Sequence, residues 1–212
     1  MPSKIKANIS PQDLIHDLKK YRDKVIEGDA DDAKIIDTDD VIVDMRVRGK
    51  CHYACEEYNT NMNCPPHVFS IEQTKRLINN YLFAILLNFK VPSDIIAGEL
   101  SEEQAKELRK YGVKRYQIIG KLEREAFDDG YPLSLGFAGG PCSTYLCPNQ
   151  DCQALEEGKC RHPLLARPSM EAMGMDVYRL AAEVGWDIYP IGGHTNPDEI
   201  PHGTFVGIVF IE

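Results

Sequence analysis

The chain has no excess of positive charge. Its 212 residues include 24 Lys and Arg against 33 Asp and Glu, which gives a formal net charge of -9. A protein that tracks nucleic-acid phosphates normally carries basic patches, and the sequence contains none. The charge balance therefore argues against a nucleic-acid partner.

Long hydrophobic runs are also missing. The longest, residues 81–89, is about half of the ~20 residues that a membrane-spanning helix needs. The first 22 residues carry charges where a signal peptide would have its apolar core. We therefore expect a cytoplasmic protein that does not bind membranes. Thiols stay reduced in that compartment, so the seven cysteines need an explanation other than disulfide bonds.

Common catalytic motifs are absent as well. The glycines at 136, 139 and 140 have neither the lysine nor the spacing of a phosphate-binding loop. No Gly-x-Ser-x-Gly nucleophile elbow occurs. The motifs alone leave open whether the protein is an enzyme.

The composition is that of a folded protein, with 43% hydrophobic and 27% charged residues. The length predicts one domain over residues 1–212, with residues 1–30 as an appended N-terminal helix. We predict an α/β fold: a single mixed-sheet domain with flanking helices and two cysteine-rich metal-binding loops. These loops are expected to bring the cysteines to one end of the sheet.

Four helices are predicted from capping signals. Ser10 and Pro11 begin a helix that runs to about Val25. Capping boxes begin two more, at Ser70 and at Ser101, which run to about residue 80 and to the turn at 128–130. Ser169 is expected to cap a helix over residues 170–184.

Strands are predicted from apolar alternation and from apolar runs. Residues 33–38 and 41–47 are expected to form a hairpin, with 41–47 leading directly to Cys51. Further strands are expected at 82–91, 133–138, 186–191 and 204–211. The last is apolar on both faces, which is typical of a central strand.

The cysteines fall into two sets separated by about 77 cysteine-free residues. The first set is Cys51, Cys55 and Cys64, followed by two prolines. The second set is Cys142, Cys147, Cys152 and Cys160. A random scatter would rarely place all seven in two short windows, so this clustering is the strongest functional signal in the sequence.

The second set has the four thiolates that a tetrahedral zinc ion or a cubane iron–sulfur cluster requires. Its gaps of four, four and seven residues only partly match the Cys-x2-4-Cys pairs of structural zinc sites. The spacing therefore favours a cluster over zinc.

The first set has three cysteines and ends in Cys64-Pro65, like the Cys-Pro ending of bacterial ferredoxin runs. Either another residue completes the ligand shell or one iron stays open to chemistry. His52, His67 and His162 are the candidate additional ligands, although a histidine beside a cysteine more often lies outside the ligand shell.

Ordinary buried core thiols are the alternative explanation for these cysteines. The segments around them are polar and rich in turn residues, whereas core cysteines lie in apolar strands. Metal ligation is therefore the favoured interpretation of both sets. Arg167, close after the second set, either neutralises a bound anion or pairs with a helix carboxylate such as Glu171.

Several of these features resemble a known family. They are the first set with Tyr58 inside it and Cys64-Pro65-Pro66 at its end, the run 160–163, and the run 166–172. The chain resembles the predicted metal-binding proteins whose domain of unknown function carries the number 2284, found mostly in anaerobic bacteria and archaea. The family often has two residues between the first two cysteines, where this chain has three. The resemblance implies metal binding by the cysteines, and iron–sulfur clusters, but no reaction.

Three hypotheses follow from the sequence. The leading one is a protein with two [4Fe-4S] clusters that transfers electrons to or from a redox partner protein in an anaerobic cytoplasm. The second is an enzyme whose three-cysteine cubane has an open iron that acts as a Lewis acid on a small-molecule substrate. The third is a protein with purely structural zinc.

Overall fold

The structure is a computed structural model that describes residues 3–28 and 30–211. The helices are α1 (Pro11–Glu27), α2 (Met45–Ala54), α3 (Ile71–Ile78), α4 (Glu102–Asp128), α5 (Cys142–Leu146), α6 (Gln153–Glu156) and α7 (Val177–Glu183). The strands are β1 (Asp32–Asp37), β2 (Phe83–Val91), β3 (Leu135–Phe137) and β4 (Gly203–Phe210). Short 3-10 turns are η1 (Thr38–Asp40), η2 (Ser93–Ile95) and η3 (Pro197–Glu199).

The strands form one sheet in the order β1-β2-β4-β3. Every pairing between them is antiparallel, whereas the prediction was a sheet with both parallel and antiparallel pairings. The reason is the position of β4. Helix α4 connects β2 to β3, which run parallel to each other, and β4 lies between them as in a split βαβ unit.

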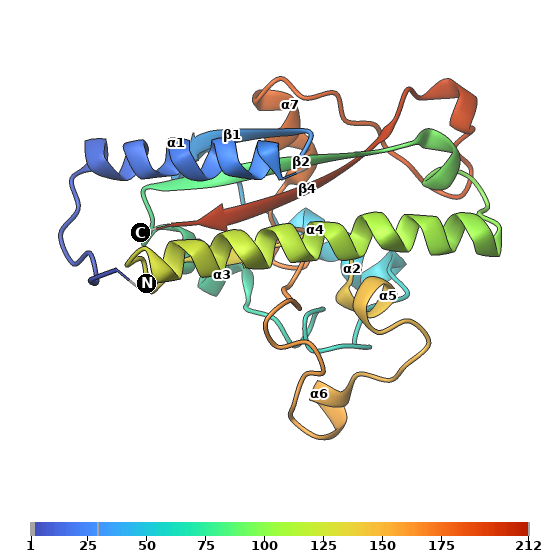
Figure 1. Ribbon diagram of the computed structural model, residues 1–212. Helices are drawn as coiled ribbons and strands as arrows, with labels where there is room; N and C mark the ends of the chain where they lie inside the picture. The colour runs from blue at the N-terminus through green and yellow to red at the C-terminus, as the bar shows by residue number, and fades with distance from the viewer. Residues whose placement is uncertain (1–2, 29, 212) are drawn as a thin grey trace.

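Helices cover both faces of this sheet, which confirms an α/β fold of a single domain with flanking helices. Successive side chains of a strand point to opposite faces, and β2 shows this clearly. Ile85 and Leu87 pack with α1 and α4, whereas Ala84 and Leu86 pack with α3 and α7. Figure 1 shows α1 and α4 lying side by side along the front of the sheet.

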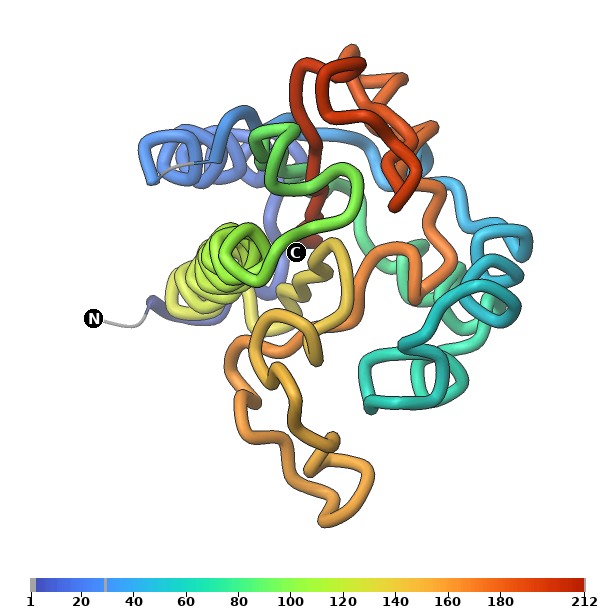
Figure 2. Tube along the Cα trace, turned by 90° about the vertical axis from the view of Figure 1, so that its right-hand side faces the viewer, coloured from blue at the N-terminus to red at the C-terminus, as the bar shows by residue number. Residues whose placement is uncertain are grey.

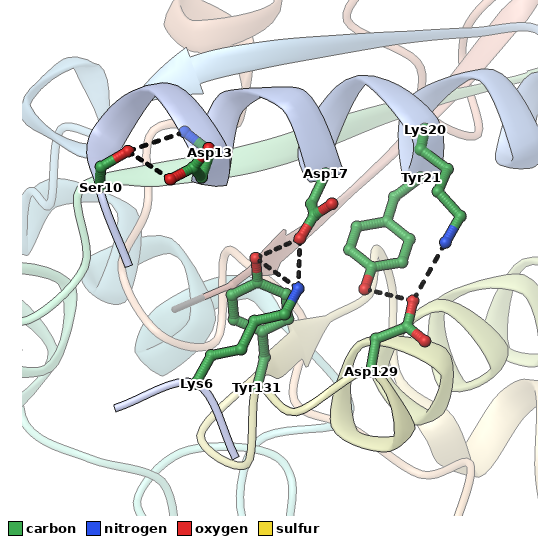
Figure 3. A network of polar contacts seen from close by, with 8 residues as sticks. All are labelled: Lys6, Ser10, Asp13, Asp17, Lys20, Tyr21, Asp129 and Tyr131. Carbon is green, nitrogen blue, oxygen red and sulfur yellow. Dashed lines mark hydrogen bonds and ion pairs between the residues drawn. The ribbon is translucent and has the colours of Figure 1, made fainter. Parts of the chain in front are cut away.

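Helix α1 is joined to α4 by apolar and polar contacts. Leu14, Leu18 and Tyr21 are fully buried against the sheet and α4. The hydroxyl of Tyr21 donates to Asp129 at 2.8 Å, beyond the end of α4 (Figure 3). The hydroxyl of Tyr131 donates to Asp17 at 2.7 Å, and Lys6 pairs with the same carboxylate.

Most of the predicted elements are present. Ser10 caps α1, and both capping boxes form, from Ser70 to Gln73 and from Ser101 to Gln104. The strands predicted at 82–91 and 204–211 are β2 and β4, with β4 in the interior of the sheet as expected. The strand predicted at 133–138 is shorter, since β3 covers only 135–137.

The hairpin prediction was wrong in its second strand. β1 pairs with β2 instead, and only Val43 forms an isolated bridge, to Met175. Asp44 accepts a hydrogen bond from the backbone N–H of Arg46 and begins α2 at Met45. A local helix cap thus overrides the apolar alternation.

Two further predictions were wrong near the C-terminal end. The helix expected from Ser169 begins at Val177, because Gly174 has a φ of 86° and Asp176 provides the cap. Residues 186–191 form no strand, although Trp186 is buried and its indole N–H donates to Asp32 at 2.8 Å. Tertiary burial of the tryptophan, not sheet pairing, explains the apolar character there.

No helix in the described part of the chain is both long enough and apolar enough to cross a membrane.

Candidate metal centre

All four cysteines of the second set line one cavity of about 680 Å³. Cys142 is the first residue of α5 and Cys147 follows its last turn. Cys152 precedes α6, and Cys160 follows the turn at Gly158. The long segment from β3 to α7 therefore wraps its thiols around a single space.

The first cysteine segment forms another wall of this cavity, through Glu57 and residues 60–63. In both views of the chain the two cysteine segments lie on the same side of the molecule (Figures 1 and 2). Segments about 80 residues apart in the sequence thus meet at one site.

Two asparagines connect the sulfur atoms of the two sets. The side-chain amide of Asn61 donates to Cys64 Sγ at 3.2 Å, and its oxygen lies 3.8 Å from Cys142 Sγ as acceptor. The amide of Asn63 donates to Cys142 Sγ at 3.4 Å. Asn61 is 1% exposed, so this bridge is shielded from water.

Glu57 joins the same two segments through hydroxyl groups. It accepts hydrogen bonds from Ser143 at 2.7 Å and from Thr144 at 3.3 Å, both in α5. Thr60 on its own segment also donates to it, at 2.7 Å. These contacts fix the first segment against α5, the helix that begins with Cys142.

Burial raises the pKa of two of these thiols. The pKa of Cys64 rises to about 12, first because the group is buried and then because Cys142, Glu57 and Cys55 lie nearby. The pKa of Cys142 rises to about 11, again chiefly by burial, with Cys160 and the other thiols of its set adding. Metal binding at these cysteines must therefore displace protons, which makes metal affinity dependent on pH.

Cys51 and Cys55 lie at the C-terminal end of α2. Cys51 is half-buried and lines a second cavity, of about 350 Å³, together with Glu171. Burial raises the pKa of Cys51, and the neighbouring Cys55 and Glu171 raise it further. Cys55 follows the helix and is exposed.

The thiols lie in the same part of the molecule, but their sulfur atoms do not form a complete metal-ligand shell. Among residues 3–28 and 30–211, no three His, Cys, Asp or Glu side chains are close enough together to hold a metal ion. The donor type suits a thiophilic metal or a cluster, and four such donors share one cavity. Binding would need the cysteine loops to draw their sulfurs together.

Two of the candidate histidine ligands, His67 and His162, take part in hydrogen bonds. His67 is exposed, and its Nε2 shares a hydrogen bond with Asn59 Oδ1 at 2.8 Å. The backbone N–H of His162 donates to Cys160 Sγ at 3.3 Å. The role of all three histidines as ligands stays a prediction.

Two charged residues at this end of the molecule were not singled out by the sequence patterns as parts of a site. Arg115 of α4 is fully buried, donates to the carbonyl of Gly139, and lies 3.9 Å from the ring centre of Phe205. Glu171 has one carboxylate oxygen, Oε2, that is buried without a hydrogen-bond partner. Arg115 falls in no recognisable motif. Glu171 lies in the family-like run 166–172, but the sequence did not mark it as a ligand, because contacts with distant segments decide its surroundings.

Arg167 does pair with a helix carboxylate, but the partner is Glu123 of α4. The two form a bidentate pair at 2.8 and 2.9 Å. Arg167 is therefore unavailable to Glu171.

The fold and this site define a cysteine-rich α/β protein with a candidate metal centre between two loops. The chain belongs to the family described as Predicted metal-binding protein (DUF2284), which matches residues 34–211. No curated protein and no solved structure matches the chain. Metal binding is thus the coarse function that the family membership supports.

Proposed function

We propose that the protein binds iron–sulfur clusters of the [4Fe-4S] type through its two cysteine sets and serves in electron transfer. The observation that carries this proposal is the cavity of about 680 Å³ that all four thiols of the second set line. A four-sulfur zinc site closes around the ion with Zn–S distances of about 2.3 Å. A larger cofactor makes better use of a cavity of this size.

The surroundings of the sulfurs support a redox centre. Hydrogen bonds from protein N–H groups to cluster sulfurs are among the features that set reduction potentials. Asn61 and Asn63 direct amide N–H groups at Cys64 and Cys142, and the backbone of His162 does so at Cys160. These donors would stabilise the thiolate form that a cluster requires.

The second cluster belongs to Cys51, Cys55 and Cys64 in this proposal, close to the first because Asn61 bridges Cys64 and Cys142. A bound cluster would supply a one-electron redox centre. The partner is a redox protein or a small-molecule substrate in the cytoplasm. The net charge of -9 disfavours nucleic acid.

The test is to measure iron, acid-labile sulfide and zinc in protein purified without oxygen. Visible and electron paramagnetic resonance spectra are recorded before and after dithionite. About eight irons with matching sulfide and a reducible signal are expected. Stoichiometric zinc without colour would replace the proposal with a structural metal, and added small molecules that perturb the spectrum would favour an enzyme.

A cysteine variant separates two centres from one. Cys64→Ala should remove only the iron of the first set, while Gln150→Ala, at an exposed residue that lines the cavity, should keep both. Loss of all iron from Cys64→Ala would indicate a single shared centre, an arrangement that the contact through Asn61 makes physically reasonable.

A further inference from the structure

Hydrogen bonds connect the segment that contains Glu171 to α2, the helix that contains Cys51. Arg48, one helical turn before Cys51, donates to the carbonyls of Phe69 at 2.8 Å and Ala172 at 3.0 Å. The backbone N–H of Asp44 donates to the carbonyl of Gly174 at 2.9 Å. These contacts hold the start of α2 and residues 172–174 in fixed register, so the positions of Cys51 and Glu171 are coupled.

The approach between these segments is close enough to require a glycine. A Cβ at Gly174 would lie 2.4 Å from Ile71 and 3.3 Å from Arg48. The turn that precedes it is closed by Ser169, whose hydroxyl accepts the N–H of Ala172 at 3.0 Å. Glu171 sits within this turn and is therefore not a freely moving surface side chain.

The carboxylate of Glu171 is only partly satisfied by its surroundings. Ser169 forms a side-chain hydrogen bond with it, and Arg115 attracts it electrostatically. Lys50, which lines the same cavity, lies over the ring of Tyr178. The Oε2 atom of Glu171 is buried with no hydrogen bond. A buried carboxylate is costly unless it is paired, hydrogen-bonded or bound to a metal.

One neighbour of Glu171 is a thiol of the first set, Cys51. Cys51 and Glu171 line the same cavity of about 350 Å³, and Cys51 also has Cys55 as an electrostatic neighbour. His67, the histidine that follows this set in the sequence, is exposed and bonded to Asn59. Glu171 thus offers an unpaired buried carboxylate oxygen beside Cys51 of the three-cysteine set.

We infer that Glu171 is the fourth protein ligand of the first cysteine set and supplies a carboxylate oxygen beside Cys51, Cys55 and Cys64. Carboxylate oxygen joins cysteine sulfur and histidine nitrogen among the ligands that proteins offer to metals. The inference rests on the proposed cluster binding. It assigns to this set a mixed sulfur and oxygen shell in place of an open iron.

The experiment compares Glu171→Gln, Glu171→Cys and Asp176→Asn in the full chain, reconstituted without oxygen with ferrous iron and sulfide. Asp176 lines the same cavity, and asparagine preserves its capping of α7. The substitutions are made in wild type and in a Cys147→Ala/Cys152→Ala background, in which only the first set can hold a cluster. The readouts are iron per chain, the rate of iron loss to a chelator, and the paramagnetic resonance signal.

Glu171→Gln is expected to lose first-set iron at least tenfold faster than the parent. Glu171→Cys should retain the iron with an altered resonance signal, and Asp176→Asn should match the parent. The unfolding midpoint of metal-free Glu171→Gln should be unchanged or higher, because the amide removes a charged group whose Oε2 atom is buried without a hydrogen-bond partner.

Two outcomes would overturn the assignment while leaving cluster binding intact. One is parental iron retention and signal in Glu171→Gln. The other is a marked fall in the metal-free midpoint of Glu171→Gln, which would show a purely structural role. Failure of the parent chain itself to take up iron would overturn the proposed function, and the ligand assignment with it.

Discussion

The face of the sheet that α1 and α4 cover differs from the cysteine-bearing end of the molecule in how completely it satisfies buried charge. Between α1 and α4, the hydroxyls of Tyr21 and Tyr131 each meet a carboxylate, and Lys6 completes the network (Figure 3). At the cysteine end, Glu171 Oε2 and two nitrogens of Arg115 are buried without hydrogen bonds. The polar groups between α1 and α4 are satisfied within the protein. The unpaired groups at the cysteine end are free to bond to a ligand.

The largest expected effect is the loss of a metal ligand. Cys147→Ala should remove about one cluster's worth of iron and lower the melting temperature of the holo protein. The free energy of unfolding should fall by several kcal/mol, because apparent binding energies of structural metals are on the order of 10 kcal/mol. Iron analysis and thermal unfolding measure both effects.

The matched control is Gln150→Ala, an exposed residue that lines the same cavity. It should change neither quantity. Unchanged iron content and melting temperature in Cys147→Ala would show that the second set is not a metal site.

The next effect separates the fold from the site. Leu18 is 0% exposed between α1 and the sheet, so Leu18→Ala should cost about 2–5 kcal/mol in the free energy of unfolding. Iron per folded chain should not change. Denaturant unfolding with iron analysis tests this, and a loss of iron would show that the two regions are coupled. Leu164→Ala, at a side chain that is 67% exposed, is the control and should shift stability by less than about 0.5 kcal/mol.

A glycine at the boundary of the two regions gives a third comparison. A Cβ at Gly112 of α4 would lie 1.9 Å from the ring of Tyr145 in α5. Gly112→Ala should therefore cost about 1–3 kcal/mol and, by moving α5, weaken metal retention at Cys142. Chelator competition and thermal unfolding would measure these changes.

Gly49→Ala makes the same substitution in α2, where no atom lies within 4 Å of the new Cβ. It should be neutral or stabilise by up to about 1 kcal/mol. If the two glycine variants behave alike, the packing of α5 on α4 does not position the site.

The smallest expected effect is a pH dependence of the free energy of unfolding, which arises from the acidic groups between α1 and α4. Burial alone would raise the pKa of Asp17, but hydrogen bonds from Lys6 and Tyr131 outweigh it and lower that pKa. The pKa of Asp129 is lowered in the same way, by Tyr21 and Lys20. A lowered folded-state pKa gives stability that is present above the unfolded value of about 3.9 and is lost as pH falls through the folded value.

Unfolding measured from pH 6 to pH 3 should therefore show an acid loss that Asp17→Asn reduces. At neutral pH this variant should cost about 1 kcal/mol. Asp39→Asn, at an exposed residue in η1, should keep the acid dependence of the parent. An equal acid dependence in Asp17→Asn would assign the effect to other groups.

The sequence allowed much of the scaffold to be predicted, because its signals are local. Serine caps with glutamine three residues later gave the start of α3 and of α4. Local signals also misled: alternation at 41–47 predicted a strand, although Asp44 caps a helix one residue later. The competing signal there was a single side-chain cap.

The sequence predicted both cysteine sets and their position at one end of the sheet, but not the contacts that join them. Asn61, Glu57 and Ser143 join segments about 80 residues apart, and such contacts leave no periodic trace. Glu171 was noted as part of the run 166–172 and as a partner for Arg167, but not as a ligand, since its surroundings depend on α2. Long-range packing, which no single-sequence pattern encodes, decides the site.

The position of β4 between β2 and β3 determines how late in synthesis the sheet can form. All seven cysteines precede β4 in the sequence, so a growing polypeptide displays every thiol before the strand that fills the middle of the sheet exists. Domains form as units only when their parts are available. During synthesis the thiols are therefore accessible to a metal donor, or to oxidation, before the sheet can close over its core.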